Sequence, residues 1–181
     1  MQMKEWEANI EVHNPLDRAS LSQEEKLLQR CKERSLYLLT GTAKTERRLR
    51  EKLEKSQRYT EDIIAKTIDF LKEYDYLNDY TYALRYLEEN SGKRSLLDMK
   101  AKLFQRGVDC ASLKEAIEAF QEKQREEEID PEREALRQCL EKKRRTLDLS
   151  DPKDKQKLYA FLMRKGFSYD LIREALNLSE G

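Results

Sequence analysis

The sequence predicts an all-α protein, an elongated curved array of three tandem three-helix repeats with about nine helices. The main observation is a set of five apolar positions that recurs with nearly constant spacing. Its members are Leu49, Leu53, Tyr59, Ile64 and Ile68; Met99, Leu103, Val108, Leu113 and Ile117; and Leu158, Leu162, Phe167, Ile172 and Leu176. These spacings fit helices, and a period of about fifty residues is typical of repeats that must stack to bury their apolar faces.

The composition supports this class. Charged residues make up 40% of the 181 residues and aromatic residues 8%, with only five glycines and three prolines, which favours long solvated helices over a sheet. Residues 1–20 lack helical periodicity and are expected to form an irregular N-terminal arm. The three repeats are then expected over residues 21–77, 78–129 and 130–181.

Capping residues place the individual helices. Ser22 and Glu25 form an S-x-x-E capping box, and Ser112 and Glu115 form another. Further N-caps are expected at Thr60, Asn78, Asp130, Asp151 and Ser168. Four of the five glycines (Gly41, Gly92, Gly107 and Gly166) fall at predicted helix ends, where a left-handed residue is common. The expected helices cover residues 22–39, 43–56, 60–75, 79–90, 95–106, 112–128, 131–146, 153–165 and a last one after 168.

Charge follows the same repeat, although 36 basic and 36 acidic residues cancel overall. The second helices hold seven basic against three acidic residues (43–58), five against one (93–106) and five against one (153–165), an excess of +4 each. The third helices over 60–75 and 112–128 each carry −3. Either neighbouring helices pair across their flanks, or the second helices form a basic stripe that suits phosphates and the third helices an acidic face that suits a basic protein. The pattern leaves both open.

Catalytic and metal-binding patterns are missing from the sequence. His13 is the only histidine, and Cys31, Cys110 and Cys139 form no CxxC pair, so we expect no enzyme, cofactor, metal or disulfide framework. No apolar signal or membrane segment is apparent, which favours the cytoplasm. The aromatic residues between the first two repeats are expected to pack in a core rather than stack on bases; they are Phe70, Tyr74, Tyr76, Tyr80, Tyr82 and Tyr86.

Three ordered segments resemble the RecX family. They are Leu77-Asn78-Asp79-Tyr80-Thr81-Tyr82-Ala83, then Gly92-Lys93, then Leu103-Phe104-Gln105-Arg106-Gly107-Val108. The family pattern is L-N-D-x-x-Y-A, a turn with Gly-Lys, and L-x-x-K/R-G-I/V. Leu162-Met163-Arg164-Lys165-Gly166-Phe167 is similar to the corresponding third-repeat segment. The resemblance covers about residues 24–178.

The resemblance implies a non-enzymatic modulator of the recombinase RecA. Such a protein would lodge in the helical groove of RecA–single-stranded-DNA filaments and restrain recombinase, ATPase and coprotease activities in homologous recombination, DNA repair and the SOS response. A monomer is expected, with no membrane partner. The motif residues Asn78, Asp79, Tyr82, Ala83, Gly107 and Gly166 are expected to be structural. The rival hypothesis is a direct DNA-binding helical-repeat module, and a third is a plain scaffold for another protein.

Partner or DNA binding is assigned to the basic stripe. Its members are Lys44, Arg47, Arg48, Lys93, Arg94, Lys100, Arg106, Lys142, Lys143, Arg144, Arg145 and Lys165. The first repeat departs from the family pattern, which commonly has Arg-Ser before the second helix and Lys-Gly at its end. Here Lys44-Thr45 and Lys55-Ser56-Gln57-Arg58 stand there, which predicts a looser turn.

Overall fold

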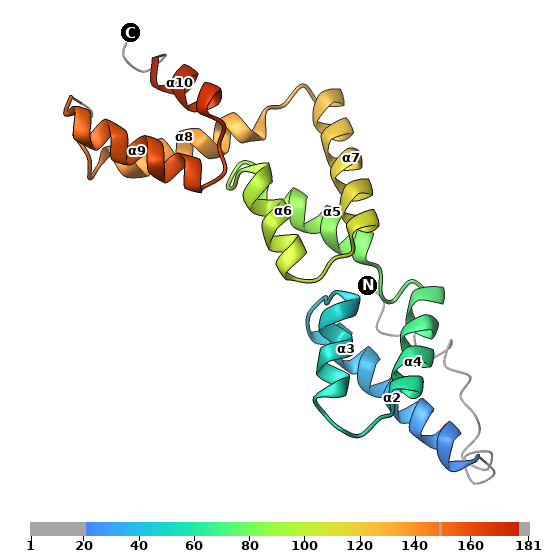
Figure 1. Ribbon diagram of the computed structural model, residues 1–181. Coiled ribbons are helices and arrows are strands. Elements are labelled where there is room, and N and C mark those ends of the chain that lie inside the picture. The colour runs from blue at the N-terminus through green and yellow to red at the C-terminus, as the bar shows by residue number, and fades with distance from the viewer. Residues whose placement is uncertain (1–20, 149, 178–181) are drawn as a thin grey trace. The chain divides into compact units, whose positions relative to one another are not determined.

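The computed structural model describes residues 21–148 and 150–177, and within them every regular element is a helix (Figure 1). The helices are α2 (Gln23–Gly41), α3 (Glu46–Glu54), α4 (Glu61–Glu73), α5 (Asp79–Asn90), α6 (Leu96–Gln105), α7 (Cys110–Glu126), α8 (Pro131–Arg144), α9 (Pro152–Arg164) and α10 (Tyr169–Asn177). The predicted all-α class is confirmed. Contacts divide the described residues into two units, residues 21–44 with 48–77, and residues 45–47 with 78–148 and 150–177.

Three clusters of buried apolar side chains hold the helices in successive groups of three. The first lies among α2, α3 and α4, the second among α5, α6 and α7, and the third among α8, α9 and α10. The recurring apolar positions are buried except Tyr59 and Leu113, which are partly buried. Each repeat of the sequence pattern therefore supplies one core, as the helical-repeat prediction requires.

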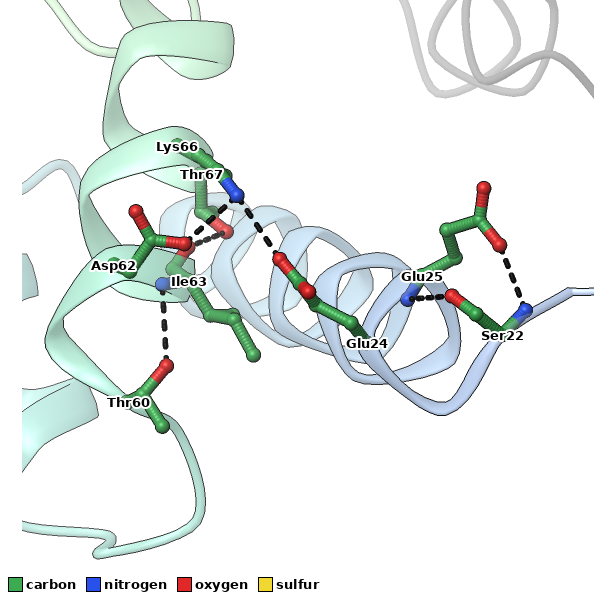
Figure 2. Close-up of polar contacts among 8 residues, drawn as sticks. All are labelled: Ser22, Glu24, Glu25, Thr60, Asp62, Ile63, Lys66 and Thr67. Carbon is green, nitrogen blue, oxygen red and sulfur yellow. Dashed lines mark hydrogen bonds and ion pairs between the residues drawn. The ribbon is translucent and has the colours of Figure 1, made fainter.

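In the first unit, two reciprocal hydrogen bonds cap the start of α2 (Figure 2). The Ser22 hydroxyl accepts a hydrogen bond from the Glu25 N–H at 3.2 Å, and the Glu25 carboxylate accepts one from the Ser22 N–H at 2.7 Å. The predicted capping box is confirmed. It satisfies two backbone donors that a helix start would otherwise leave unpaired.

One lysine ties α4 to α2. The Lys66 ammonium contacts Asp62 on its own helix at 2.7 Å and Glu24 on α2 at 3.0 Å (Figure 2). Hydrogen bonds to these two carboxylates raise the pKa of Lys66 to about 12, and the bond to Asp62 has the larger effect. The bridge is exposed, so we expect it to orient the two helices more than to stabilise them.

The predicted end of α2 at Gly41 is wrong. The helix runs through Gly41 to an extended Thr42, and Gly41 has no positive φ. The side chain of Lys44 explains this difference. Its ammonium donates hydrogen bonds to the carbonyls of Leu38 and Thr42, both at 2.7 Å. A side chain therefore satisfies the last carbonyls where a left-handed glycine was expected.

The predicted capping box at Ser112 is also wrong. Helix α7 begins at Cys110, two residues earlier than expected, and its N-cap is Asp109. The Asp109 carboxylate accepts hydrogen bonds from the N–H groups of Ala111 and Ser112, both at 3.0 Å. Hydrogen bonds from Ser112 are the main reason that the pKa of Asp109 is lowered.

The turn after α3 contains a left-handed residue that is not a glycine. Gln57 has φ 53°, and its N–H donates to the Glu54 carbonyl at 2.9 Å. The glycine after α6 makes the equivalent bond, from the Gly107 N–H to the Phe104 carbonyl at 2.9 Å. The substitution seen in the sequence therefore preserves the first bond of the turn at a cost in backbone strain.

Candidate functional site

Five basic side chains converge on one pocket of the second unit, with a volume of about 560 Å³. Lys93 and Arg94 lie in the turn before α6, Lys142 and Lys143 in the last turn of α8, and Lys165 at the C-cap of α9. The other lining residues are Asn90, Ser95, Asp98, Cys139, Thr146, Phe161 and Phe167. We call this site the basic pocket.

A contact between α6 and α9 positions the pocket. The side chain of Ser95, the N-cap of α6, is buried, and its hydroxyl donates a hydrogen bond to the Lys165 carbonyl at the end of α9. Gly166 follows with φ 90°, and a methyl group there would lie 2.7 Å from the Ser95 hydroxyl oxygen. Glycine thus allows the end of α9 to approach the start of α6 closely. We call this arrangement the junction.

The same arrangement recurs at the preceding repeat position, where Thr45, Glu46 and Arg47 belong to the second unit. The buried Thr45 hydroxyl donates to the Arg106 carbonyl at 2.6 Å. A methyl group on Gly107, which has φ 82°, would lie 2.6 Å from Arg47 Cβ. A buried hydroxyl, a neighbouring carbonyl and a left-handed glycine therefore form a repeated structural element.

A carboxylate completes each junction. The Asp79 carboxylate accepts a hydrogen bond from the Glu46 N–H at 2.9 Å, and the Glu132 carboxylate accepts one from the Leu96 N–H. Both bonds satisfy an orphan N–H at a helix start, where the positive end of the helix dipole also favours an anion. Burial is the main cause of the raised pKa of Glu132.

The electrostatics of the basic pocket are strongly positive. Five cationic side chains face one carboxylate, Asp98, which pairs with Arg94 at 2.7 Å. The hydrogen bond with Asp98 is the main cause of the raised pKa of Arg94. In the same pocket, the Lys143 ammonium lies 4.6 Å and the Lys165 ammonium 5.8 Å from the centroid of the Phe161 ring.

This arrangement suits an anion. Like charges held close together repel, and an anion between them removes that cost while gaining charge-assisted hydrogen bonds. Asn90 and Thr146 line the same pocket, where the Asn90 amide donates to the Tyr86 carbonyl at 2.8 Å and the Thr146 hydroxyl to the Lys143 carbonyl at 3.0 Å, which leaves the cationic side chains as the main donors to an anion. The residues that line it include no histidine and one cysteine, so the pocket has the character of a binding site rather than of an acid–base site.

Two other members of the predicted stripe make contacts within the fold. Lys44 caps α2, and burial and then repulsion by Lys52 lower its pKa. Arg106 donates a hydrogen bond to the Tyr82 hydroxyl at 3.0 Å, and its guanidinium lies 4.3 Å from the Tyr86 ring centroid. Both side chains therefore support helix ends and cores.

The remaining members lie apart from the basic pocket. Arg48 is exposed on the first-unit part of α3, and Arg47 lies beside Gly107. Lys100 is half-buried on α6 within electrostatic reach of Glu132, Arg144 lines another pocket between α8 and α10, and Arg145 is the exposed C-cap of α8. The structure thus gathers five of the twelve predicted residues at one place.

The motif residues lie at helix starts, in the core and at the junctions. Asn78 caps α5 by accepting from the Thr81 N–H at 3.0 Å, and Ala83 is fully buried. The sequence analysis missed Thr45 and Ser95, although both stand four residues before an apolar position of the repeat, Leu49 and Met99. That shared register was the available signal.

Two further findings concern the described part of the chain. None of its helices is long and apolar enough to cross a membrane. No group of three or more histidine, cysteine, aspartate or glutamate side chains there is arranged to hold a metal ion.

The fold and the pocket together define a class, an all-α helical-repeat protein that gathers basic side chains where successive repeats meet. The sequence profile described as RecX, third three-helix domain, matches residues 130–176. The regulatory protein RecX of Clostridium botulinum (strain Eklund 17B) is 30% identical over 150 residues, which cover 81% of this chain and 67% of that protein. The regulatory protein RecX of Clostridium tetani is 29% identical over 175 residues, covering 93% of this chain and 77% of that protein.

Solved structures show the same fold. The crystal structure of RecX from Lactobacillus salivarius matches with a TM-score of 0.67 at 20% identity, covering 84% of this chain and 96% of that one. A second crystal structure, of a regulatory protein RecX, matches with a TM-score of 0.69 at 19% identity, covering 83% and 73%. The chain belongs to the RecX family.

Proposed function

We propose that this protein regulates RecA by binding the helical groove of RecA–single-stranded-DNA filaments and inhibiting recombinase, ATPase and coprotease activities. The basic pocket carries the proposal, because five cations around about 560 Å³ suit consecutive phosphates of the DNA in such a filament. Family membership supports a regulatory role, since the relatives are named regulatory proteins. The proposal places the protein in the cytoplasm and in DNA repair, homologous recombination and the SOS response.

The mechanism is occupancy without chemistry. A monomer bound in the groove would bridge neighbouring recombinase subunits and block duplex entry or filament growth. The basic pocket would hold the DNA backbone while other surfaces contact protein. Phosphate contacts fix position without selecting base sequence, which suits a regulator that acts on filaments of any sequence.

The test measures DNA-dependent ATP hydrolysis by RecA with the protein added at substoichiometric amounts. We expect inhibition by the wild type and much weaker inhibition by the double variant Lys93→Glu/Lys142→Glu, which reverses two charges in the pocket. The control Lys72→Glu/Lys114→Glu makes the same change in net charge on exposed positions of α4 and α7 and should inhibit like the wild type. Failure of the wild type to inhibit would reject the function. Equal inhibition by all three proteins would reject the role of the pocket.

Binding to single-stranded DNA alone separates this function from a direct DNA-binding module. A regulator of filaments should bind naked DNA weakly and the filament strongly. Because each neutralised phosphate contributes about 0.7 to the slope of log affinity against log salt on single strands, the Lys93→Glu/Lys142→Glu variant should lower the filament-binding slope by about 1.4. Tight binding to naked DNA with no preference for the filament would favour the rival function.

A further inference from the structure

A second pocket of about 450 Å³ is lined by residues from the start of α6 and the end of α9. Its lining combines apolar side chains and carboxylates; the residues are Leu97, Asp130, Glu132, Met163, Gly166, Phe167, Ser168 and Leu171. We call it the apolar pocket. All of its residues belong to the second unit, so its shape rests on contacts within that unit.

Large apolar side chains around this pocket are unusually exposed. Leu97 is 61% and Met163 49% exposed, although both line it. Ile129 and Tyr169, which directly adjoin lining residues in the chain, are 50% and 56% exposed. The described residues expose seven large hydrophobic side chains by 44% or more, and two of these, Leu97 and Met163, line this one pocket. Such a concentration marks an interaction surface rather than scattered surface residues.

Exposure also recurs at one repeat position. Met163 follows the buried Leu162, as Phe104 follows the buried Leu103 in the preceding repeat, and Phe104 is 63% exposed. Neither side chain is needed in the core, because the preceding leucine already fills it. An apolar side chain is therefore left outside the core at the same position of two repeats.

The sign of charge differs between the two pockets. Asp130 and Glu132 line the apolar pocket, whereas five cations and one carboxylate line the basic pocket. Asp130 pairs with Arg133 at 2.9 Å, and Glu132 caps α6, so both carboxylates are held in fixed positions. A segment that fits here presents an apolar side chain together with a lysine or arginine.

The two pockets share one lining residue, Phe167. A ligand that covers both surfaces must offer phosphates on one side and an apolar, basic segment on the other. A nucleoprotein has that composition, and naked nucleic acid does not. We propose that the apolar pocket binds a segment of the filament protein itself, with one apolar side chain inserted beside Leu97 and Met163 and a lysine or arginine facing Asp130 and Glu132. This inference rests on the function proposed above.

The experiment measures the affinity of fluorescently labelled protein for RecA–single-stranded-DNA filaments at several salt concentrations. We expect Leu97→Ser/Met163→Ser to bind about tenfold more weakly with an unchanged salt slope, because the lost contact is apolar. The control Tyr37→Ser/Tyr74→Ser removes two exposed aromatic side chains of the first unit and should bind like the wild type. A loss equal to that of the Lys93→Glu/Lys142→Glu variant in both affinity and slope would overturn the separation into two pockets.

A pair of single variants tests the chemistry of the partner. Met163→Glu and Met163→Arg are both polar at the same half-exposed position, so a comparison between them cancels any general effect on folding. A basic partner segment should make the arginine variant bind more weakly than the glutamate variant. Equal or reversed affinities would overturn the proposal, as would wild-type affinity of Leu97→Ser/Met163→Ser. Lost self-association of that variant in sedimentation, with unchanged filament binding, would assign the pocket to a second copy and overturn it too. If the wild type does not bind filaments at all, both this inference and the proposed function fail.

Discussion

The substitution Gly166→Ala tests the junction most directly. It adds one methyl group where the backbone has φ 90°, at 2.7 Å from the Ser95 hydroxyl oxygen and 2.9 Å from Leu97 Cβ. Contacts below 3.0 Å between such atoms force a shift, and the Leu97 Cβ beside it is fixed to the α6 backbone. The start of α6 and the end of α9 must therefore move apart.

The cost can be estimated from three destabilising effects and one that opposes them. An alanine in the left-handed region costs about 1–2 kcal/mol. Loss of the hydrogen bond from the Ser95 hydroxyl to the Lys165 carbonyl costs about 1 kcal/mol, and overpacking costs about 1–3 kcal/mol. Lower entropy of the unfolded chain returns about 0.4–1 kcal/mol. The free energy of unfolding should fall by about 4 kcal/mol.

Gly92→Ala is the matched control. Gly92 has φ 69°, so the backbone cost is similar, but a methyl group there would meet only the Glu134 side chain, at ordinary distances of 3.5 Å to Cγ and 4.0 Å to Cβ. The two variants should differ by about 3 kcal/mol in urea unfolding followed by circular dichroism, or by about 6–12 °C in melting temperature. Equal stability of the two variants would refute the close-approach argument and leave only the backbone strain.

Three other predictions concern single contacts. Ser95→Ala should lower the free energy of unfolding by about 1–2 kcal/mol in urea, because it removes both the hydrogen bond to the Lys165 carbonyl and the N-cap of α6; an unchanged value would contradict the junction. Asp109→Ala should cost about 1 kcal/mol in the same assay by removing the N-cap of α7, whereas Ser112→Ala should cost less, and the reverse order would restore the capping box at Ser112. Hydrogen bonds from Arg137 and then Gln138 lower the pKa of Glu134 to about 2 from 4.5, so its stabilising effect is present above pH 4.5 and lost as the pH falls towards 2. Melting temperatures of wild type and Glu134→Gln should therefore differ at pH 6 and converge near pH 2, and a constant difference would show that ionisation of Glu134 does not matter.

The core and most helix ends could be predicted because their signals are local. The apolar spacing around Leu103 and Leu162 requires only a helical period, and caps such as Asn78 act within three residues of themselves. The errors at Gly41 and Ser112 have the same origin. In each case a different side chain makes the capping hydrogen bonds. Lys44 bonds carbonyls at the end of α2, and Asp109 bonds N–H groups at the start of α7.

The basic pocket could be predicted only in part, because it depends on contacts between repeats. Charge counting found Lys93 and Lys142 but could not show that residues some fifty positions apart converge at one junction. Charge counting also could not distinguish these pocket lysines from Arg106, whose guanidinium instead contacts Tyr82 and Tyr86 within the fold. The apolar pocket could not be predicted, because the spacing of an exposed leucine such as Leu97 along a helix does not distinguish it from a buried leucine.

The junction also gives the repeats a direction. The second repeat has both halves of it, the Ser95 hydroxyl that donates and the Gly107 that admits a neighbour. The first repeat has the hydroxyl of Thr45 but Gln57 where the glycine would be, and the third has Gly166 but Asp154 four residues before Leu158, where its carboxylate binds Lys157 at 2.8 Å. Among the described helix groups, the second therefore carries both halves of the junction, and the first and third carry one half each. Duplicating residues 78–129 should lengthen the protein by one module, with the Ser95 hydroxyl of one copy taking the place of Thr45 against the Arg106 carbonyl and Gly107 of the next copy.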